Sequence, residues 1–348
     1  MHERSRCDGL RSGVIGVVAC IALGLAGCQS TLSPSPGTAQ APRRIDPEST
    51  AESAQSKGPR ATGVTYAEIA SAYNARIRRL ECVTANAEIH VESRDNDGKA
   101  VENNAEGFLL LVRPRKVSLR IDKVSQTYFV LGSDSSRFWW LDLGGEKRVG
   151  LVGLHRLASP QSAAAFGVPV YPLDLLELLG VMPLPEDEAS LDLVVPTLLK
   201  DGRLEIVLPG RGREWGSTRY VLDRVSFLPM RIELLDARGG IAAAGVLSRW
   251  VDVTVVSEAL TGAAMPGNLD VDLPGIPAKV TMRLNDVKNP GVDKIKSANF
   301  DLERLKGIYR VEQFYSLDEA PKPGTAQSPT RPGDGSRGGL NIERGGDR

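Results

Sequence analysis

The stretch Val117-Ser118-Leu119-Arg120-Ile121-Asp122 decides the fold of this chain, because its apolar and polar side chains alternate at every position. A period of two is typical of a β-strand that buries one face and exposes the other. The apolar segment from Gly107 to Arg113, which ends at Pro114, predicts a neighbouring strand. Together the two segments predict an antiparallel sheet with one face in the core and the other in water.

Similar strand patterns lie on both sides of this pair. They cover Val83 to Ser93, Thr127 to Leu131, Arg137 to Leu143, Arg203 to Leu208, Arg219 to Asp223, Pro229 to Leu235, Gly245 to Val255 and Lys279 to Asn285, with a further strand expected toward Phe300. Turn sequences separate the strands, such as Asp95-Asn96-Asp97-Gly98 and Gly132-Ser133-Asp134-Ser135. Trp139 and Trp140 point to opposite faces of one strand, so both are buried only if both faces are covered. The chain is therefore predicted to be mainly β.

Two helices are expected among these strands. Thr65 and Glu68 have the spacing of a capping box, and an apolar stripe at helical spacing follows: Tyr66, Ile69, Ala70, Tyr73, Ile77 and Leu80. This pattern predicts an amphipathic helix that packs on an apolar surface. The segment from Leu173 to Leu179 lies between Pro172 and Gly180, which predicts a short and very apolar helix.

The N-terminus has the pattern of a lipoprotein signal peptide. Three arginines precede an apolar run that begins near Val14 and closes with Leu25-Ala26-Gly27-Cys28. This ending resembles the bacterial lipobox, and the resemblance implies cleavage behind Gly27 and a diacylglyceryl anchor on Cys28. The apolar run is shorter than the roughly 20 residues that a transmembrane helix needs. We therefore expect an exported protein that is anchored to a membrane by lipid.

The chain divides into four segments. Residues 1–27 are the predicted signal peptide, 28–63 the lipidated cysteine and a disordered tether, 64–318 the folded domain and 319–348 a disordered tail. The tether and the tail are rich in small and polar residues, and they lack the large apolar side chains that offset the entropy cost of ordering. A flexible tether of this length reaches roughly 30 Å.

Composition excludes several classes of function. Removal of residues 1–27 takes away three arginines and two acidic residues, so the formally neutral chain becomes a mature protein with one net negative charge. Nucleic acid is not an expected partner, because its binding needs clustered Lys and Arg. Of the mature chain's histidines, His90 and His155 lie far apart, so no metal site and no cofactor are expected. Cys82 is the one thiol left for the folded domain, and it is expected to be buried. No Gly-x-Ser-x-Gly elbow is present, and we expect no enzyme.

The order of the predicted elements resembles the LolA/LolB family of envelope lipoprotein carriers. The matching stretches are Phe108 to Pro114 with Val117 to Ile121, Leu131-Gly132-Ser133-Asp134 with Phe138-Trp139-Trp140, and Tyr220-Val221-Leu222-Asp223 with Leu228-Pro229-Met230-Arg231-Ile232-Glu233. The resemblance spans roughly residues 64–318. It implies a mainly β (α+β) fold, in which a curved antiparallel half-barrel sheet has the N-terminal amphipathic helix and a short lid helix in its mouth. An apolar cavity would lie between the sheet and the helices.

The residues that line this cavity are predicted from the same resemblance. They come from the apolar side of the strands (Phe108, Leu110, Leu119, Ile121, Phe129, Trp140, Ile232 and Met282) and from the lid helix (Leu175, Leu176 and Leu179). The alternative for each of them is ordinary core packing between the sheet and the helices. A single-layered sheet needs its apolar face covered, and a ligand can supply part of that cover.

The function implied by the resemblance is that of an anchored envelope protein that binds the acyl chains of a lipid or lipoprotein, for trafficking or insertion. Two alternatives stay open. One is a regulator or sensor of the envelope, which would add an envelope protein as partner. The other is a structural lipoprotein without cargo. Gln29 stands where an aspartate retains lipoproteins in the inner membrane of enteric bacteria, so we expect the periplasmic face of the outer membrane in preference to the inner.

Overall fold

The computed structural model describes residues 63–94, 99–124, 126–145, 147–158, 171–187, 194–210, 216–255, 263–274 and 278–319. The predicted signal peptide, the tether up to residue 62 and the tail from residue 320 therefore lie outside the described residues, as do Cys28 and the expected turn at residues 95–98. Within these ranges no helix is both long and apolar enough to span a membrane.

One sheet of 15 strands makes up most of the described chain, which confirms the mainly β prediction. Its strands are β1 (Cys82–Arg94), β2 (Ala100–Val112), β3 (Lys116–Lys123), β4 (Gln126–Ser133), β5 (Arg137–Asp142), β6 (Val149–Leu154), β7 (Thr197–Leu198), β8 (Leu204–Pro209), β9 (Ser217–Leu222), β10 (Pro229–Leu235), β11 (Ile241–Asp252), β12 (Thr254–Val255), β13 (Ala264–Asp272), β14 (Ala278–Asn289) and β15 (Gln313–Ser316).

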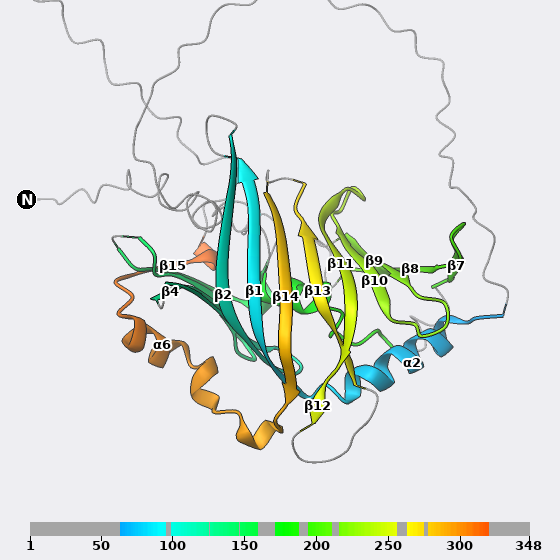
Figure 1. Ribbon diagram of the computed structural model, residues 1–348, viewed down its shortest axis with the longest axis horizontal. Coiled ribbons are helices and arrows are strands. Elements are labelled where there is room, and N and C mark those ends of the chain that lie inside the picture. Colours follow the sequence, from blue (N-terminus) through cyan, green and yellow to red (C-terminus); the bar gives the residue numbers. More distant parts are fainter. Residues whose placement is uncertain are drawn as a thin grey trace, which may run out of the picture.

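The sheet consists of two antiparallel meanders that meet at its centre. The spatial order is β15-β6-β5-β4-β3-β2-β1-β14-β13-β11-β10-β9-β8-β7, with β12 beside β14. The long strands β1 and β14 join the N-terminal meander to the C-terminal one (Figure 1), and Ile89 is opposite Met282 in this pairing. Two short strands break the antiparallel rule, because β15 runs parallel to β6 and β12 runs parallel to β14.

Three α-helices accompany the sheet among the described residues. The first, α2 (Tyr66–Arg78), begins with the predicted capping box, in which Thr65 accepts the Glu68 N–H and Glu68 accepts the Thr65 N–H. The second, α4 (Pro172–Leu178), has Pro172 in its first turn, and Gly180 follows its end with a φ of +66°. The third, α6 (Leu302–Tyr309), was not expected from the sequence.

The sheet is curved, because α4 contacts both β4 and β10. These strands are seven steps apart in the sheet order, which is about 34 Å in a flat sheet, whereas a seven-residue helix is only about 10 Å long. The concave face is apolar, and its buried side chains form one continuous cluster with those of α2 and α4. The curved sheet and the lid position of α4 thus agree with the predicted half-barrel.

Among the described residues, α6 covers one end of the convex face. There α6 packs against the sheet, and Leu302 and Leu305 contact a second buried cluster that contains Val130, Trp139 and Leu141. Figure 1 shows α6 and α2 at opposite ends of the sheet. Trp140 belongs to the concave cluster, and Trp139 belongs to the convex one. Both faces are therefore covered at this strand, which is the condition under which both tryptophans can be buried.

The strand prediction differs from the structure in several places, and the strands β6, β7 and β15 were not predicted. The expected strand toward Phe300 is absent, because 3-10 turns occupy Val292–Lys294 and Ser297–Phe300. Residues Ala264–Asp272 form strand β13, which the sequence pattern did not indicate. The segment contains a proline and a glycine, Pro266 and Gly267, which are rare inside strands and hide the period of two.

Candidate functional site at the mouth of the half-barrel

The register between β2 and β3 decides which predicted lining residues face the concave side. Leu109 is opposite Leu119, whereas Phe108 is opposite Arg120 and Leu110 is opposite Ser118. Phe108 and Leu110 therefore share the face of the polar residues of β3, and Phe108 is 36% exposed. Their assignment to the cavity lining is wrong. Three successive leucines, at 109 to 111, hide the phase of this strand in the sequence.

The other predicted lining residues all lie in the concave cluster. Leu119, Ile121, Phe129, Trp140, Ile232 and Met282 come from the sheet, and Leu175, Leu176 and Leu179 come from α4 and the residue after it. They are brought together as the sequence predicted. Each of them is also buried as part of the core.

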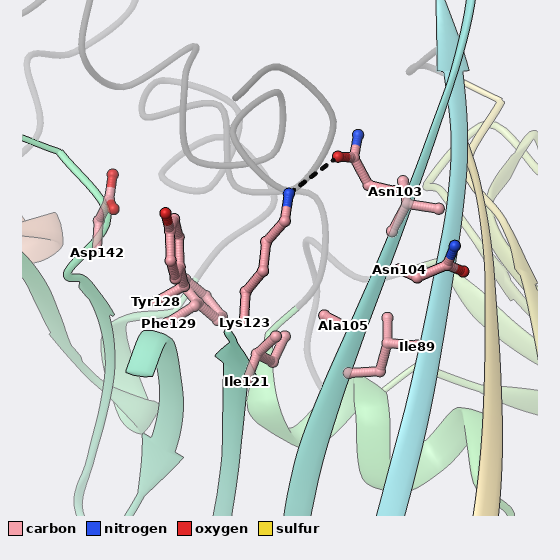
Figure 2. Close-up of a pocket in the computed structure, with 10 residues that line it drawn as sticks. Ile89, Asn103, Asn104, Ala105, Ile121, Lys123, Tyr128, Phe129 and Asp142 are labelled. Atoms are coloured by element: carbon pink, nitrogen blue, oxygen red, sulfur yellow. Dashed lines mark hydrogen bonds between the residues drawn. The ribbon is translucent and has the colours of Figure 1, made fainter. Parts of the chain in front are cut away.

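A hollow opens at the end of the concave face where strands β1 to β5 meet. Its lining includes apolar side chains of Ile89, Val91, Ala105, Ile121 and Phe129. Polar residues also line the hollow, namely Asn103, Asn104, Lys123, Tyr128 and Asp142. Figure 2 shows the Lys123 side chain rising from the end of β3 toward Asn103, with an Nζ to Oδ1 distance of 3.4 Å. The mouth thus combines an apolar floor with a polar rim.

The hollow is small between the described residues. Its volume is about 40 Å³, little more than one water molecule occupies in the liquid. Ligand pockets for small molecules usually have volumes of about 300 Å³ or more. The hollow can therefore accept the end of an apolar chain, and a whole acyl chain needs α4 to move away from the concave face.

Sequence reasoning missed most of the rim. Lys123 continues the alternation of Val117, Leu119 and Ile121, so it occupies the fourth inward position of that strand. Asp142 lies two residues after Trp140 on β5, and side chains two positions apart on a strand point to the same face of the sheet. A charged residue at an inward position of an alternating strand was the signal that could have identified Lys123. Strand β5 is apolar at four successive positions before Asp142, so no such signal marks that residue.

Polar contacts hold α4 in the concave face. The carbonyl oxygen of Gly180 accepts the Tyr73 hydroxyl at 2.9 Å and Arg76 Nη2 at 2.6 Å, and both donors belong to α2. On the other side of the helix, the Tyr220 hydroxyl of β9 donates to Glu177 Oε1. These contacts connect the lid helix to α2 and to the sheet.

Burial shifts the pKa values of Glu177 and Arg76, two of the residues in these contacts. The pKa of Glu177 is raised to about 8, first because burial disfavours the carboxylate and second because Asp174 is nearby. Burial also lowers the pKa of Arg76, which lies over the rings of Tyr73 and Trp250. Near neutral pH, Glu177 is therefore largely protonated in the closed arrangement.

The fold is similar to those of several solved structures. A LolA superfamily protein from Nitrosomonas europaea matches with a TM-score of 0.44 at 12% identity, over 69% of this chain and 99% of that one. A DUF1329 family protein from Desulfovibrio piger matches with a TM-score of 0.43 at 11% identity, over 68% of this chain and 98% of that one. A domain from Vibrio parahaemolyticus, described as a putative outer membrane lipoprotein-sorting protein domain, matches with a TM-score of 0.42 at 12% identity. The match covers 69% of this chain and 97% of that one.

This likeness is one of fold, and it agrees with the LolA/LolB resemblance expected from the sequence. No protein-family model matches the chain, and no curated protein matches it significantly. The likeness says nothing of what this chain binds. In the described part of the chain, no group of three or more His, Cys, Asp or Glu side chains is placed to hold a metal ion.

Proposed function

We propose that this protein is an envelope lipoprotein, anchored through Cys28, that receives the acyl chain of a lipid or lipoprotein at the mouth of its half-barrel. The observation that carries the proposal is the hollow between β1 and β5, whose apolar floor lies open beneath a polar rim. An amphiphile is divided in the same way into an apolar and a polar part. Its hydrocarbon chain is apolar and suits the floor, and its head group is polar and suits the rim. The lipobox-type sequence supports the anchor, and it agrees with a site that faces a membrane surface.

The lid helix sets how far a chain can enter. Leu175, Leu176 and Leu179 occupy the concave face in the closed arrangement, so a chain that goes beyond the mouth must replace their contacts. The replacement costs little apolar burial, because methylene groups of the ligand cover the same surface. The polar contacts of Gly180 and Glu177 are what the open form loses.

A second candidate is a structural lipoprotein without cargo. The observation that favours it is the packing of the concave cluster, in which the side chains of α2 and α4 fill most of the described interior. In this case the small hollow at the mouth is a packing defect, and the lid does not open.

Photolabelling of the full chain separates the two candidates. The lipidated protein is reconstituted in phosphatidylcholine vesicles that contain a trace of phospholipid with a diazirine in its acyl chain, and the labelled peptides are identified by mass spectrometry. Lipid binding predicts labels on the β3–β4 segment around Ile121 and Phe129. Phe129→Ala should reduce this labelling about threefold, because it removes part of the apolar floor.

Phe108→Ala is the matched control, since Phe108 lies on the convex face of β2, two strands away from β4. It should leave the labelling of the mouth unchanged. Circular dichroism of both variants shows that each is folded before the comparison is made. Labels that avoid the concave face in the unmodified protein would overturn lipid binding in favour of the structural candidate. The mass of the N-terminal peptide, with Cys28→Ser as reference, tests the anchor.

A further inference from the structure

The two charged side chains at the mouth have no partner of opposite charge among the residues that the structure describes. Lys123 makes a hydrogen bond to Asn103, and it forms no ion pair with a described residue. Asp142 accepts the N–H of Gly144 at 3.1 Å, and it too forms no ion pair in the described chain. Charged neighbours on the same strands behave differently. Asp122, on the opposite face of β3, is paired with Arg120 at 2.9 Å.

The missing partner matters more for Asp142 than for an exposed acid. Its side chain is only partly accessible, and burial raises its pKa while the Gly144 N–H lowers it to a smaller extent. A half-buried carboxyl group of this kind is stabilised as the carboxylate when a cation comes within hydrogen-bond distance. None of the described residues supplies that cation.

The register places the two charges apart on one surface. Asp142 is opposite Phe129, and Phe129 is opposite Ile121, so three neighbouring strands form a row. Lys123 lies two residues beyond Ile121 on the same face. The two residues are two strands apart across the sheet and two residues apart along it. With about 4.8 Å between strands and about 3.3 Å per residue, their backbones lie about 12 Å apart. Figure 2 shows the two side chains with Tyr128 and Phe129 between them.

We propose that the mouth recognises a phospholipid by its head group, with Lys123 binding the phosphate and Asp142 binding a primary ammonium, so that the preferred ligand is an ethanolamine phospholipid. This inference rests on the proposed function, because the chain of the same lipid would cover Ile121 and Phe129. The separated, opposite charges are complementary to a zwitterion. A primary ammonium donates hydrogen bonds to a carboxylate, whereas the quaternary ammonium of choline has no N–H to donate.

An anionic glycerol head group fits this rim less well. The phosphate of this head group would bind Lys123, but the head group has no cation to bind Asp142. The Asp142 carboxylate would also repel the negative charge of the phosphate. The structure therefore predicts an order of preference, with ethanolamine before both choline and glycerol.

The experiment uses the full lipidated chain in phosphatidylcholine vesicles with one of three tracers. The tracers carry the same diazirine acyl chain on an ethanolamine, a choline or a glycerol phosphate head group. The readout is the labelling of the β3–β4 segment by each tracer. We expect the ethanolamine lipid to label it about fivefold more than the other two, the effect of one charge-assisted hydrogen bond at a partly exposed site.

Two variants assign the charges. Asp142→Asn should remove the preference for ethanolamine while labelling by the glycerol lipid stays or rises. Lys123→Met should lower labelling by all three lipids, because each has a phosphate. The matched controls are Asp272→Asn and Lys279→Met, a cross-strand pair at the same end of the sheet on its convex face. Neither control should change the preference.

The failures are distinguishable. Equal labelling of the mouth by the three lipids would overturn the head-group inference and leave acyl-chain binding in place. Absence of label from the mouth with every tracer would overturn both. A preference for ethanolamine that survives Asp142→Asn would refute the role of Asp142.

Discussion

The hydroxyl of Tyr73 donates a 2.9 Å hydrogen bond to the carbonyl oxygen of Gly180, and this contact joins the N-terminal helix to the end of the lid helix. The two residues are 107 positions apart in the sequence. Arg76, one turn further along α2, donates to the same oxygen. The lid is thus held at a backbone atom, where substitution of the lid's own side chains leaves the acceptor in place.

Substitution of Gly180 is expected to destabilise the protein. Its φ of +66° is unfavourable for any side chain, and a Cβ atom would lie 2.9 Å from Cγ of Pro229. Gly180→Ala should lower the free energy of unfolding by about 3 kcal/mol. Gly202→Ala is the control, because Gly202 also has a positive φ but open space around it. It should cost only about 1 kcal/mol in urea unfolding. If the two substitutions lowered the free energy of unfolding equally, the close contact between the Cβ atom at position 180 and Pro229 would contribute nothing to the loss.

Arg76 is expected to depend on the shape of its guanidinium group. It donates to the carbonyl oxygens of Gly180 and Ala264 from two different nitrogens, and its plane lies over two aromatic rings. A lysine keeps the charge but cannot reproduce the fork. Arg76→Lys should therefore destabilise the protein by about 2 kcal/mol in urea unfolding. Arg78→Lys, on the exposed side of the same helix, should change it by less than about 0.5 kcal/mol.

Glu177 should make stability fall as pH rises. Its pKa is about 8 in the folded protein against 4.5 as the ordinary value, so the folded state holds the proton more tightly than the unfolded state does. The stabilisation is complete below about pH 4.5, and it is lost as pH rises through 8. Urea unfolding between pH 5 and pH 9 measures this slope. Glu177→Gln should flatten it, and an unchanged slope in the variant would contradict the assignment.

The convex cluster should depend on α6. Leu305 is buried against Trp139 and Leu141, so Leu305→Ala should reduce the free energy of unfolding by about 2 kcal/mol and shift the tryptophan fluorescence. Ile308 is on the same helix but is 57% exposed. Ile308→Ala should change stability by less than about 0.5 kcal/mol, which makes it the matched reference. Similar effects of the two substitutions would mean that α6 is not packed on the sheet.

Local patterns in the sequence were sufficient for most of the elements. The capping box at Thr65 and Glu68 predicted the start of α2, and Pro172 with Gly180 predicted the limits of α4. The alternation from Val117 to Asp122 predicted both β3 and the face that it buries. These signals work because caps, turns and strand periodicity depend on residues a few positions apart.

The candidate site was only partly predictable. Ile121 was assigned to the concave face correctly, since β3 has a clear period of two. Phe129 also lies in the concave cluster, although its strand is apolar over several successive positions and has no such period. Phe108 was assigned to the wrong face, because the adjacent leucines make both phases of β2 apolar and only its pairing with β3 separates them. The helix α6 escaped notice, because its apolar side chains face a small part of the convex surface and its pattern is short.

The sequence by itself determined that this protein is mainly β and where most of its strands, α2 and α4 lie, through the spacing of apolar side chains along one segment at a time. Only the tertiary structure decided that β1 pairs with β14, that the sheet curves around α4, and that Lys123 and Asp142 line one hollow in which no described residue pairs with either charge. The physical reason is that these relations join residues distant in sequence. They depend on strand register and on the curvature of the whole sheet, to which no local pattern refers.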